Sequence, residues 1–139
     1  MKHMKDKHFA DTNVLLYLLS QDSQKADAAE AILNTGVTIS VQVLNETTQI
    51  LRRKVKLSWS EAHEFLGLIQ SLCRVTPLTL QTHIKGLELA ERYQFSVYDS
   101  MIVAAALLAD CQILYSEDMQ HGLLVEGRLL IQNPFSKSS

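Results

Sequence analysis

Acidic side chains occur at four well-separated places along the chain, each beside an apolar segment. They are Asp11, Glu46, Asp99 and Asp118. Carboxylate oxygens suit Mg²⁺ or Mn²⁺, which bind through a few carboxylates, waters and phosphate oxygens of a substrate. An ion held in this way can activate water and offset the charge that develops on a phosphodiester. The four acids can perform this chemistry only if the elements that carry them bring them together.

Apolar segments with strand character alternate with longer segments of helical period, without a linker rich in Gly, Ser or Pro and without an internal repeat. The alternation predicts a mainly parallel sheet with helices on both faces, in one α/β unit. The expected strands are residues 7–10, 37–40, 74–77, 113–115 and 129–131. The expected helices are residues 14–20, 25–34, 41–55, 60–72, 80–94 and 97–110.

This topology places the four acids at one edge of the sheet. Asp11 follows the first strand and Asp118 lies just beyond the fourth, so both belong to the carboxyl edge of parallel strands. The helix before the fourth strand runs antiparallel to it, which returns Asp99 in its first turn to that edge. Glu46 lies beside the apolar stripe of its helix, about 7 Å from the helix start at ~1.5 Å per residue. Carboxylates gathered there repel one another unless a cation lies among them.

Helix capping is the alternative interpretation of each acid taken singly. Asp11 could cap the helix that follows it, and Ser96 with Asp99 fits the capping-box pattern. Ser58 with Glu61 shows the same pattern with no suggestion of chemistry. Capping accounts for each position, but it does not explain why four acids share one edge.

Four segments resemble, in order and spacing, the acidic motifs of PIN-domain nucleases, particularly the small bacterial ribonucleases of the VapC toxin type. They are "FADTNVLLY", "VLNETTQIL", "FSVYDSMIVAAAL" and "ILYSEDMQHG". The resemblance covers nearly the whole chain and implies a PIN-like three-layer α/β/α sandwich with a mainly parallel central sheet. It also implies an endoribonuclease that depends on Mg²⁺ or Mn²⁺ and hydrolyses RNA phosphodiester bonds. The catalytic and metal-binding positions that it implies are Asp11, Glu46, Asp99 and Asp118.

The resemblance also implies hydroxyl and amide groups that support the metal or its waters. These fall on Thr12, Asn13 and Ser116. Glu117 stands next to Asp118, and adjacent residues at a strand end point in opposite directions, so only one of the two should face the metal. We expect that residue to be Asp118.

The densest basic cluster is "RRKVK", residues 52–56, which could contact an RNA backbone or an acidic partner. The candidate RNA contacts are Arg52, Arg53 and Lys54. Positive charge at the end of a helix also complements the helix dipole, so a solvated helix end is an equal alternative. Tyr98 could stack on a base, although its position in an apolar helix favours packing in the core.

Length and composition limit the classes of protein to consider. The chain has 139 residues, of which 47% are hydrophobic, and this favours one domain over residues 1–139 with frayed tails at 1–6 and 136–139. The net charge of -2 gives no overall attraction to nucleic acid, so any phosphate-binding surface must be a local patch. The apolar run 100–109 is about half of the ~20 residues needed to cross a bilayer, and we expect a cytoplasmic protein without a membrane anchor.

The resemblance implies an RNA substrate, a homodimer and an antitoxin protein as partners. Two other functions stay open at this point. One is a non-catalytic RNA-binding or protein-interaction module on the same fold. The other is a phosphohydrolase with an aspartyl nucleophile, for which "FADTN" would be the start. Asn13 counts against the second, because that chemistry usually has an aspartate at this position.

Overall fold

The strands form one six-stranded sheet in the order β3-β2-β1-β4-β6-β5. The computed structural model describes residues 7–135, so the tails expected at 1–6 and 136–139 lie outside it. The strands are β1 (His8–Ala10), β2 (Thr38–Ser40), β3 (Arg74–Thr76), β4 (Ile113–Tyr115), β5 (Leu124–Val125) and β6 (Leu129–Gln132). All neighbouring pairs are parallel except β5 with β6, which confirms the predicted mainly parallel sheet.

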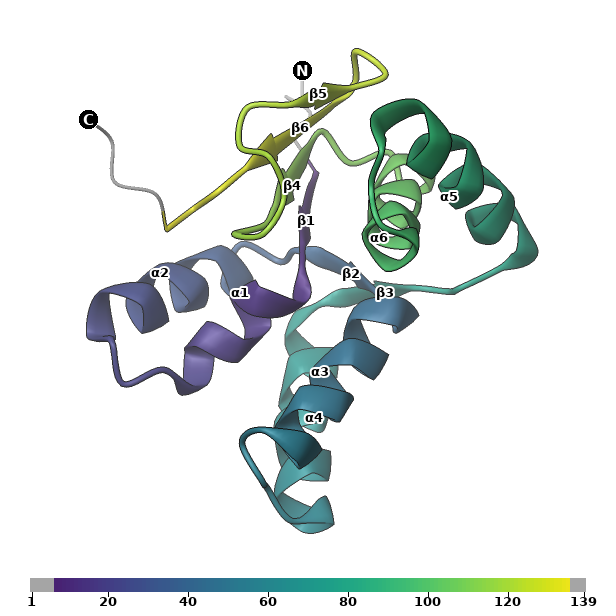
Figure 1. The fold of residues 1–139 in the computed structure, drawn as a ribbon. Coiled ribbons are helices and arrows are strands. Elements are labelled where there is room, and N and C mark those ends of the chain that lie inside the picture. Colours follow the sequence, from purple (N-terminus) through teal and green to yellow (C-terminus); the bar gives the residue numbers. More distant parts are fainter. Residues whose placement is uncertain (1–6, 136–139) are drawn as a thin grey trace, which may run out of the picture.

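The predicted helices are present, with ends that differ from the expected ones by a few residues. They are α1 (Thr12–Leu16), α2 (Ser23–Leu33), α3 (Val41–Arg53), α4 (Trp59–Leu72), α5 (Leu80–Tyr93) and α6 (Val97–Leu108). The first one begins earlier than expected because Asp11 caps it, and it continues as a 3-10 turn, η1 (Tyr17–Leu19). In Figure 1, α1 and α2 lie on one side of the sheet and α5 and α6 on the other.

Strand β5 was not predicted. It contains only two residues, too few for a periodic pattern, and it forms because a tight turn folds it back onto β6. Glu126 and Gly127 both have positive φ, at 53° and 67°, which is the geometry of a tight hairpin turn. A positive φ at a glutamate has no clear signal in the sequence.

Helix α6 fixes the position of Asp99. All residues from Ser100 to Leu107 are buried, so the helix is enclosed on every side by its neighbours, as expected of a helix that is apolar all round. Its contact with α5 is close at Gly86, where an added Cβ would lie 2.7 Å from the Met101 sulfur. Within residues 7–135, no helix is long and apolar enough to span a membrane.

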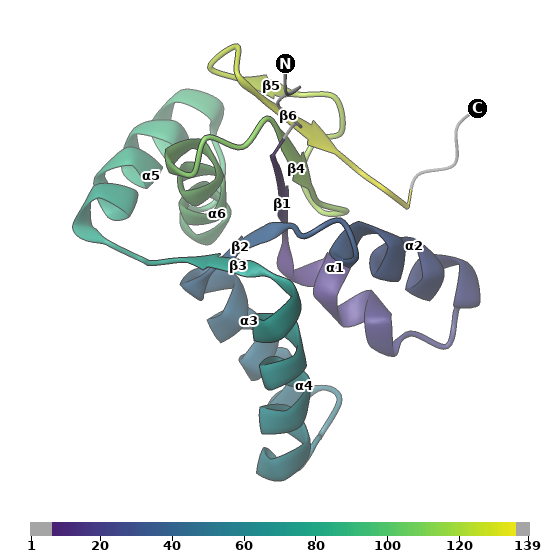
Figure 2. The same ribbon diagram turned by 180° about the vertical axis from the view of Figure 1, so that it is seen from behind.

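Helices α3 and α4 form a hairpin that extends away from the sheet. Seen from behind in Figure 2, the far end of the hairpin extends beyond both helix pairs, while the first turns of α3 contact α1 and α6. Its inner residues Val43, Leu51 and Ile69 are fully buried, and each such side chain contributes roughly 1.5–3 kcal/mol. The hairpin is therefore anchored at the sheet, while its far end is exposed to solvent.

Candidate active site

The carboxyl ends of β1 and β4 lie side by side and carry the centre of the site. Ala10 pairs with Tyr115, and the Asp11 backbone N–H continues the ladder by donating to the Tyr115 carbonyl at 2.9 Å. The Asp11 carboxylate accepts two hydrogen bonds, from the Thr12 backbone N–H at 2.7 Å and from the Ser116 hydroxyl at 2.8 Å. Asp11 is only 4% exposed, so the sheet and these two bonds hold its carboxylate in one position.

The two residues after Asp11 contact two of the other acids. The Thr12 hydroxyl donates to Glu46 Oε1 at 3.1 Å, and the Asn13 side-chain amide donates to Asp118 Oδ2 at 3.2 Å. The other oxygen of Glu46 accepts from the Gln42 amide at 2.8 Å. Glu46 and Asp118 are thus linked to the first turn of α1, beside Asp11.

The pKa values of Asp11 and Asp99 are raised, in part by the neighbouring carboxylates. Burial raises the pKa of Asp11 to about 7; the bonds from Ser116 and Thr12 oppose this rise, whereas the carboxylates of Asp99 and Glu46 add to it. The pKa of Asp99 is also raised, chiefly by burial; a hydrogen bond with the Ser96 side chain opposes this rise, and the Asp118 carboxylate adds to it. Asp11, Glu46, Asp99 and Asp118 therefore form one region of negative charge, which we call the acidic cluster.

No basic side chain in the described part of the chain neutralises the acidic cluster. The ion pairs among residues 7–135 involve none of its four carboxylates. The same residues contain no group of three or more His, Cys, Asp or Glu side chains arranged closely enough to hold a metal ion. The acids therefore share one edge without converging on a point. Their donor set is all oxygen and includes a buried carboxylate without a cationic partner among these residues, and this chemistry fits a divalent cation.

Capping accounts for the backbone at the start of α6 and for one contact of the Asp99 carboxylate. Ser96 caps α6 by accepting from the Asp99 backbone N–H at 3.2 Å. At the start of α4, Ser58 and Glu61 form a complete capping box, in which the Glu61 side chain also accepts from the Ser58 backbone N–H at 2.8 Å. At α6 the described bonds to the Ser96 backbone N–H include none from Asp99, but a hydrogen bond with the Ser96 side chain lowers the pKa of the Asp99 carboxylate against the rise caused by burial. The Asp99 carboxylate thus contacts its cap residue and also lies close enough to Asp118 for the two charges to interact.

Glu117 and Asp118 point to different surroundings. The Glu117 carboxylate accepts from the Tyr17 hydroxyl and forms an ion pair with Lys25 at 3.1 Å. Lys25 also donates to the Tyr17 hydroxyl at 3.0 Å. The structure thus places Asp118 beside Asn13 and directs Glu117 to a separate contact. Nothing in the sequence indicated the role of Tyr17 and Lys25, because both come from elements distant from the "SED" segment.

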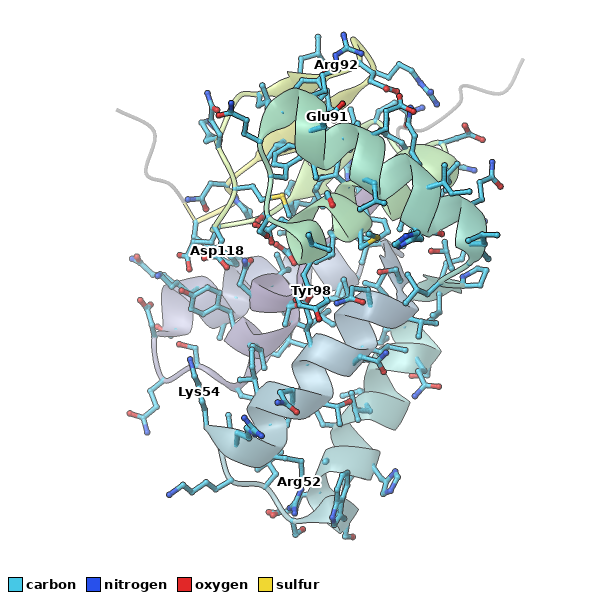
Figure 3. All side chains as sticks on the ribbon, turned by 45° about the vertical axis from the view of Figure 1, so that its right-hand side comes forward. Arg52, Lys54, Glu91, Arg92, Tyr98 and Asp118 are labelled. Atoms are coloured by element: carbon cyan, nitrogen blue, oxygen red, sulfur yellow. The ribbon has the colours of Figure 1, made fainter. Side chains whose placement is uncertain are left out.

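The basic residues predicted to contact RNA lie at the end of α3, away from the acidic cluster (Figure 3). Arg52 has a structural partner, since its guanidinium donates to the Leu57 carbonyl at 2.6 Å. Arg53 and Lys54 are exposed, and neither forms an ion pair within the described part of the chain. The expectation that Tyr98 packs in the core is wrong, because its side chain is 67% exposed. It lies in the first turn of α6, which projects past the buried part of the helix.

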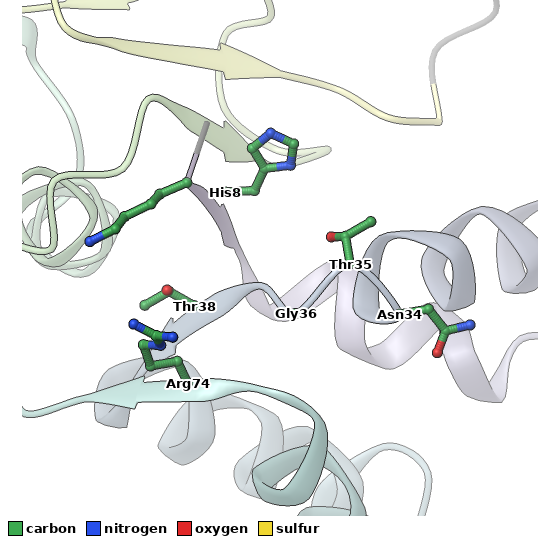
Figure 4. Close-up of a pocket in the computed structure, with 7 residues that line it drawn as sticks. His8, Asn34, Thr35, Gly36, Thr38 and Arg74 are labelled. Carbon is green, nitrogen blue, oxygen red and sulfur yellow. The ribbon is translucent and has the colours of Figure 1, made fainter. Parts of the chain in front are cut away.

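A cavity of about 730 Å³ opens at the opposite, amino edge of β1, β2 and β3 (Figure 4). The described residues that line it include three basic side chains and no carboxylate, so it is distinct from the acidic cluster. The lining residues are Lys7, His8, Asn34, Thr35, Gly36, Thr38 and Arg74. Sequence reasoning did not identify this cavity, since its residues come from three strands and a loop with no common motif.

Solved structures with the same fold include a toxin and a toxin–antitoxin complex. VapC20 of Mycobacterium tuberculosis, described as a sarcin–ricin loop cleaving toxin, is 22% identical with a TM-score of 0.66, over 81% of this chain and 90% of that chain. A toxin–antitoxin complex from Klebsiella pneumoniae is 18% identical with a TM-score of 0.71, over 94% and 100%. FitAcB from Neisseria gonorrhoeae is 18% identical with a TM-score of 0.68, over 91% and 97%. These likenesses confirm the predicted PIN-like fold.

Comparison with curated proteins found no match. Comparison with family models found that residues 9–122 match the PIN domain. The matched range contains the whole acidic cluster and most of the chain. The chain therefore belongs to the PIN domain family.

Proposed function

We propose that this chain is a metal-dependent endoribonuclease that hydrolyses RNA phosphodiester bonds at the acidic cluster. Asp11 is the observation that carries the proposal. Asp11 is only 4% exposed, its pKa is about 7, and it has no basic partner among the described residues. Such a carboxylate destabilises the folded protein, so its presence indicates a role other than folding. The chain belongs to the PIN domain family, which comprises nucleases, and this supports a nuclease function for the acidic cluster.

The four acids would hold Mg²⁺ or Mn²⁺, directly or through water. The bound ion would supply the activated water and neutralise charge on the phosphate. Asp11 is the fixed member, because the sheet and two hydrogen bonds set its position. Glu46 and Asp118 are each held by one neighbour of Asp11, and Asp99 approaches from α6.

Thr12, Asn13 and Ser116 orient the acids in this proposal. Ser116 donates to Asp11 and accepts from the backbone N–H groups of Asp118 and Met119, both at 3.3 Å. One hydroxyl thus connects the fixed acid to the loop that carries Asp118. Asn13 spans the same two segments, because its amide donates to Asp118 while its carbonyl oxygen accepts from the Glu117 N–H at 3.2 Å.

Cleavage of a single-stranded RNA in the presence of Mg²⁺, Mn²⁺ or EDTA tests this proposal. We expect internal cuts with either ion and none with EDTA. Cleavage that EDTA leaves unchanged would refute the metal dependence. A parallel assay with a small phosphate monoester separates the phosphohydrolase alternative, which would release phosphate from it. RNA binding without cleavage under any metal would instead favour the non-catalytic module.

We also propose a homodimer and an antitoxin as partners. The similar structures include toxin–antitoxin complexes, and this supports the antitoxin. An exposed apolar row on α5, formed by Leu80, Ile84 and Leu87, gives a surface that a second copy could cover. A stable dimer buries more than ~1,000 Å² in total. A monomer by light scattering at micromolar concentration would contradict the dimer.

A further inference from the structure

The far end of the α3–α4 hairpin combines an exposed aromatic ring with several cations. We call residues 52–59 the hairpin tip. Trp59, the only tryptophan of the chain, is 57% exposed. The Arg52 guanidinium lies over its ring at 4.3 Å and is itself fixed by its bond to the Leu57 carbonyl. The indole is therefore held in place although much of it faces solvent.

Three further cations of the hairpin tip have no ionic partner in the described part of the chain. Arg53, Lys54 and Lys56 are all exposed, and the ion pairs within residues 7–135 include none of them. The nearest acid in the following helix, Glu61, is used in the capping box with Ser58. Because the whole chain carries a net charge of -2, this is a local concentration of positive charge and not part of a general field.

Helix α3 connects the hairpin tip to the acidic cluster along one face. Glu46 and Arg53 are seven residues apart, which is within ~20° of two full turns and about 10 Å along the axis. Gln49, which is exposed, lies within ~60° of both residues around the helix axis. Figure 3 shows α3 running from the region of Tyr98 towards Arg52 and Lys54 at its far end. A polar surface thus leads from the acids to the cations.

We propose that the hairpin tip is an accessory binding site for single-stranded RNA that extends from the acidic cluster along α3. Trp59 stacks on a base, while Arg53, Lys54 and Lys56 contact phosphates. Single-stranded nucleic acid is recognised by this combination of a cationic surface and an aromatic platform. An acidic peptide would pair with the cations but would leave the exposed indole face without a partner. The choice of RNA rests on the proposed function, whereas binding itself can be measured without cleavage.

The single tryptophan makes the site directly observable, because all tryptophan fluorescence comes from Trp59. We expect an unstructured oligouridylate, added in EDTA so that no cleavage occurs, to quench this fluorescence to saturation. The quenching should weaken as salt is raised, because phosphate contacts release counterions. Inorganic polyphosphate and polyglutamate, which carry charge but no base, should not quench it. Equal quenching by polyglutamate would overturn the assignment in favour of an acidic protein partner.

A double variant tests the cations. Replacing Arg53 and Lys54 with glutamine should lower the affinity for the oligonucleotide roughly tenfold and reduce the salt slope by about 1.4, because two phosphates are no longer neutralised and each contributes ~0.7 for a single strand. Arg92→Gln is the matched control, because Arg92 is also exposed but lies at the other end of the molecule (Figure 3). It should bind as the wild type does. Unchanged affinity in the double variant, or a lack of quenching by RNA, would refute the site.

Cleavage distinguishes this inference from the proposed function. If both hold, the double variant and Trp59→Ala should raise KM for a long RNA and leave kcat and the cleavage of a short oligonucleotide unchanged. Cleavage of long RNA by these variants at wild-type KM would refute the accessory site and leave the nuclease intact. Quenching without cleavage under any metal would support the binding site and refute the nuclease.

Discussion

Replacing Asp11 with asparagine should stabilise the metal-free protein above neutral pH. The rise of the Asp11 pKa from its usual 3.8 to about 7 corresponds to roughly 4 kcal/mol by which ionisation destabilises the folded state. Asparagine removes this penalty and keeps an oxygen to accept from the Thr12 N–H. It exchanges the other carboxylate oxygen for an amide, so the Ser116 hydroxyl loses its acceptor, at about 1 kcal/mol. We therefore expect a net gain of roughly 2–3 kcal/mol at pH 8.

The gain should depend on pH in a defined direction. Because the pKa of Asp11 is raised on folding, the folded protein retains a proton between pH 4 and 7 that the unfolded chain releases. The stabilising contribution of this proton is complete below pH 4 and is lost as the pH rises through 7. At pH 4 the Asp11 proton should therefore cause little difference between the free energies of unfolding of the wild type and Asp11→Asn. The variant should become relatively more stable towards pH 8.

Urea unfolding in EDTA at pH 4.5 and pH 8, together with thermal melts with and without millimolar Mn²⁺, measures these quantities. At roughly 3 °C per kcal/mol for a chain of this size, the variant should melt about 6–9 °C above the wild type at pH 8 in EDTA. Mn²⁺ should raise the melting temperature of the wild type by more than that of the variant. A variant that is less stable than the wild type in EDTA at pH 8, with an undiminished response to Mn²⁺, would show that Asp11 is only a helix cap.

Four further substitutions test other parts of the structure. Asp99→Asn should lower RNA cleavage by orders of magnitude, since it removes charge from the acidic cluster, whereas Glu117→Gln should have a much smaller effect because Glu117 contacts Tyr17 and Lys25. Gly67→Ala, with open space around it, should gain about 0.5–1 kcal/mol from helix propensity. Gly86→Ala should be less stabilising than Gly67→Ala by about 1–3 kcal/mol, because the added Cβ forces the Met101 side chain to move. Cleavage rates for the first pair and denaturant midpoints for the second check these expectations.

The sheet and helices were predictable because their signals are local and periodic. Strands such as Ile113–Tyr115 are short apolar runs, and α6 carries a long run that only a buried helix accommodates. Strand β5 had no such signal, because two residues contain no period and their pairing depends on a turn at Glu126. The exposure of Tyr98 was missed for a related reason. An apolar run shows that a helix is buried, but it does not show how far the first turn projects beyond its neighbours.

The position of the four acids at one edge of the sheet was predictable, because parallel strands have their carboxyl ends on the same side whatever contacts the side chains make. The hydrogen bonds that hold the acids do not follow from that rule. Thr12 to Glu46 and Asn13 to Asp118 join residues 34 and 105 positions apart, so they depend on how α1 sits against α3 and the β4 loop. The three residues of "DTN" consequently have different roles: Asp11 carries the charge, and the next two residues each fix another acid. Loss of the Asn13 side-chain amide should therefore act through the β4 loop, because it removes the bond to the Asp118 carboxylate and the acceptor of the Glu117 backbone N–H. The topology alone does not predict this effect.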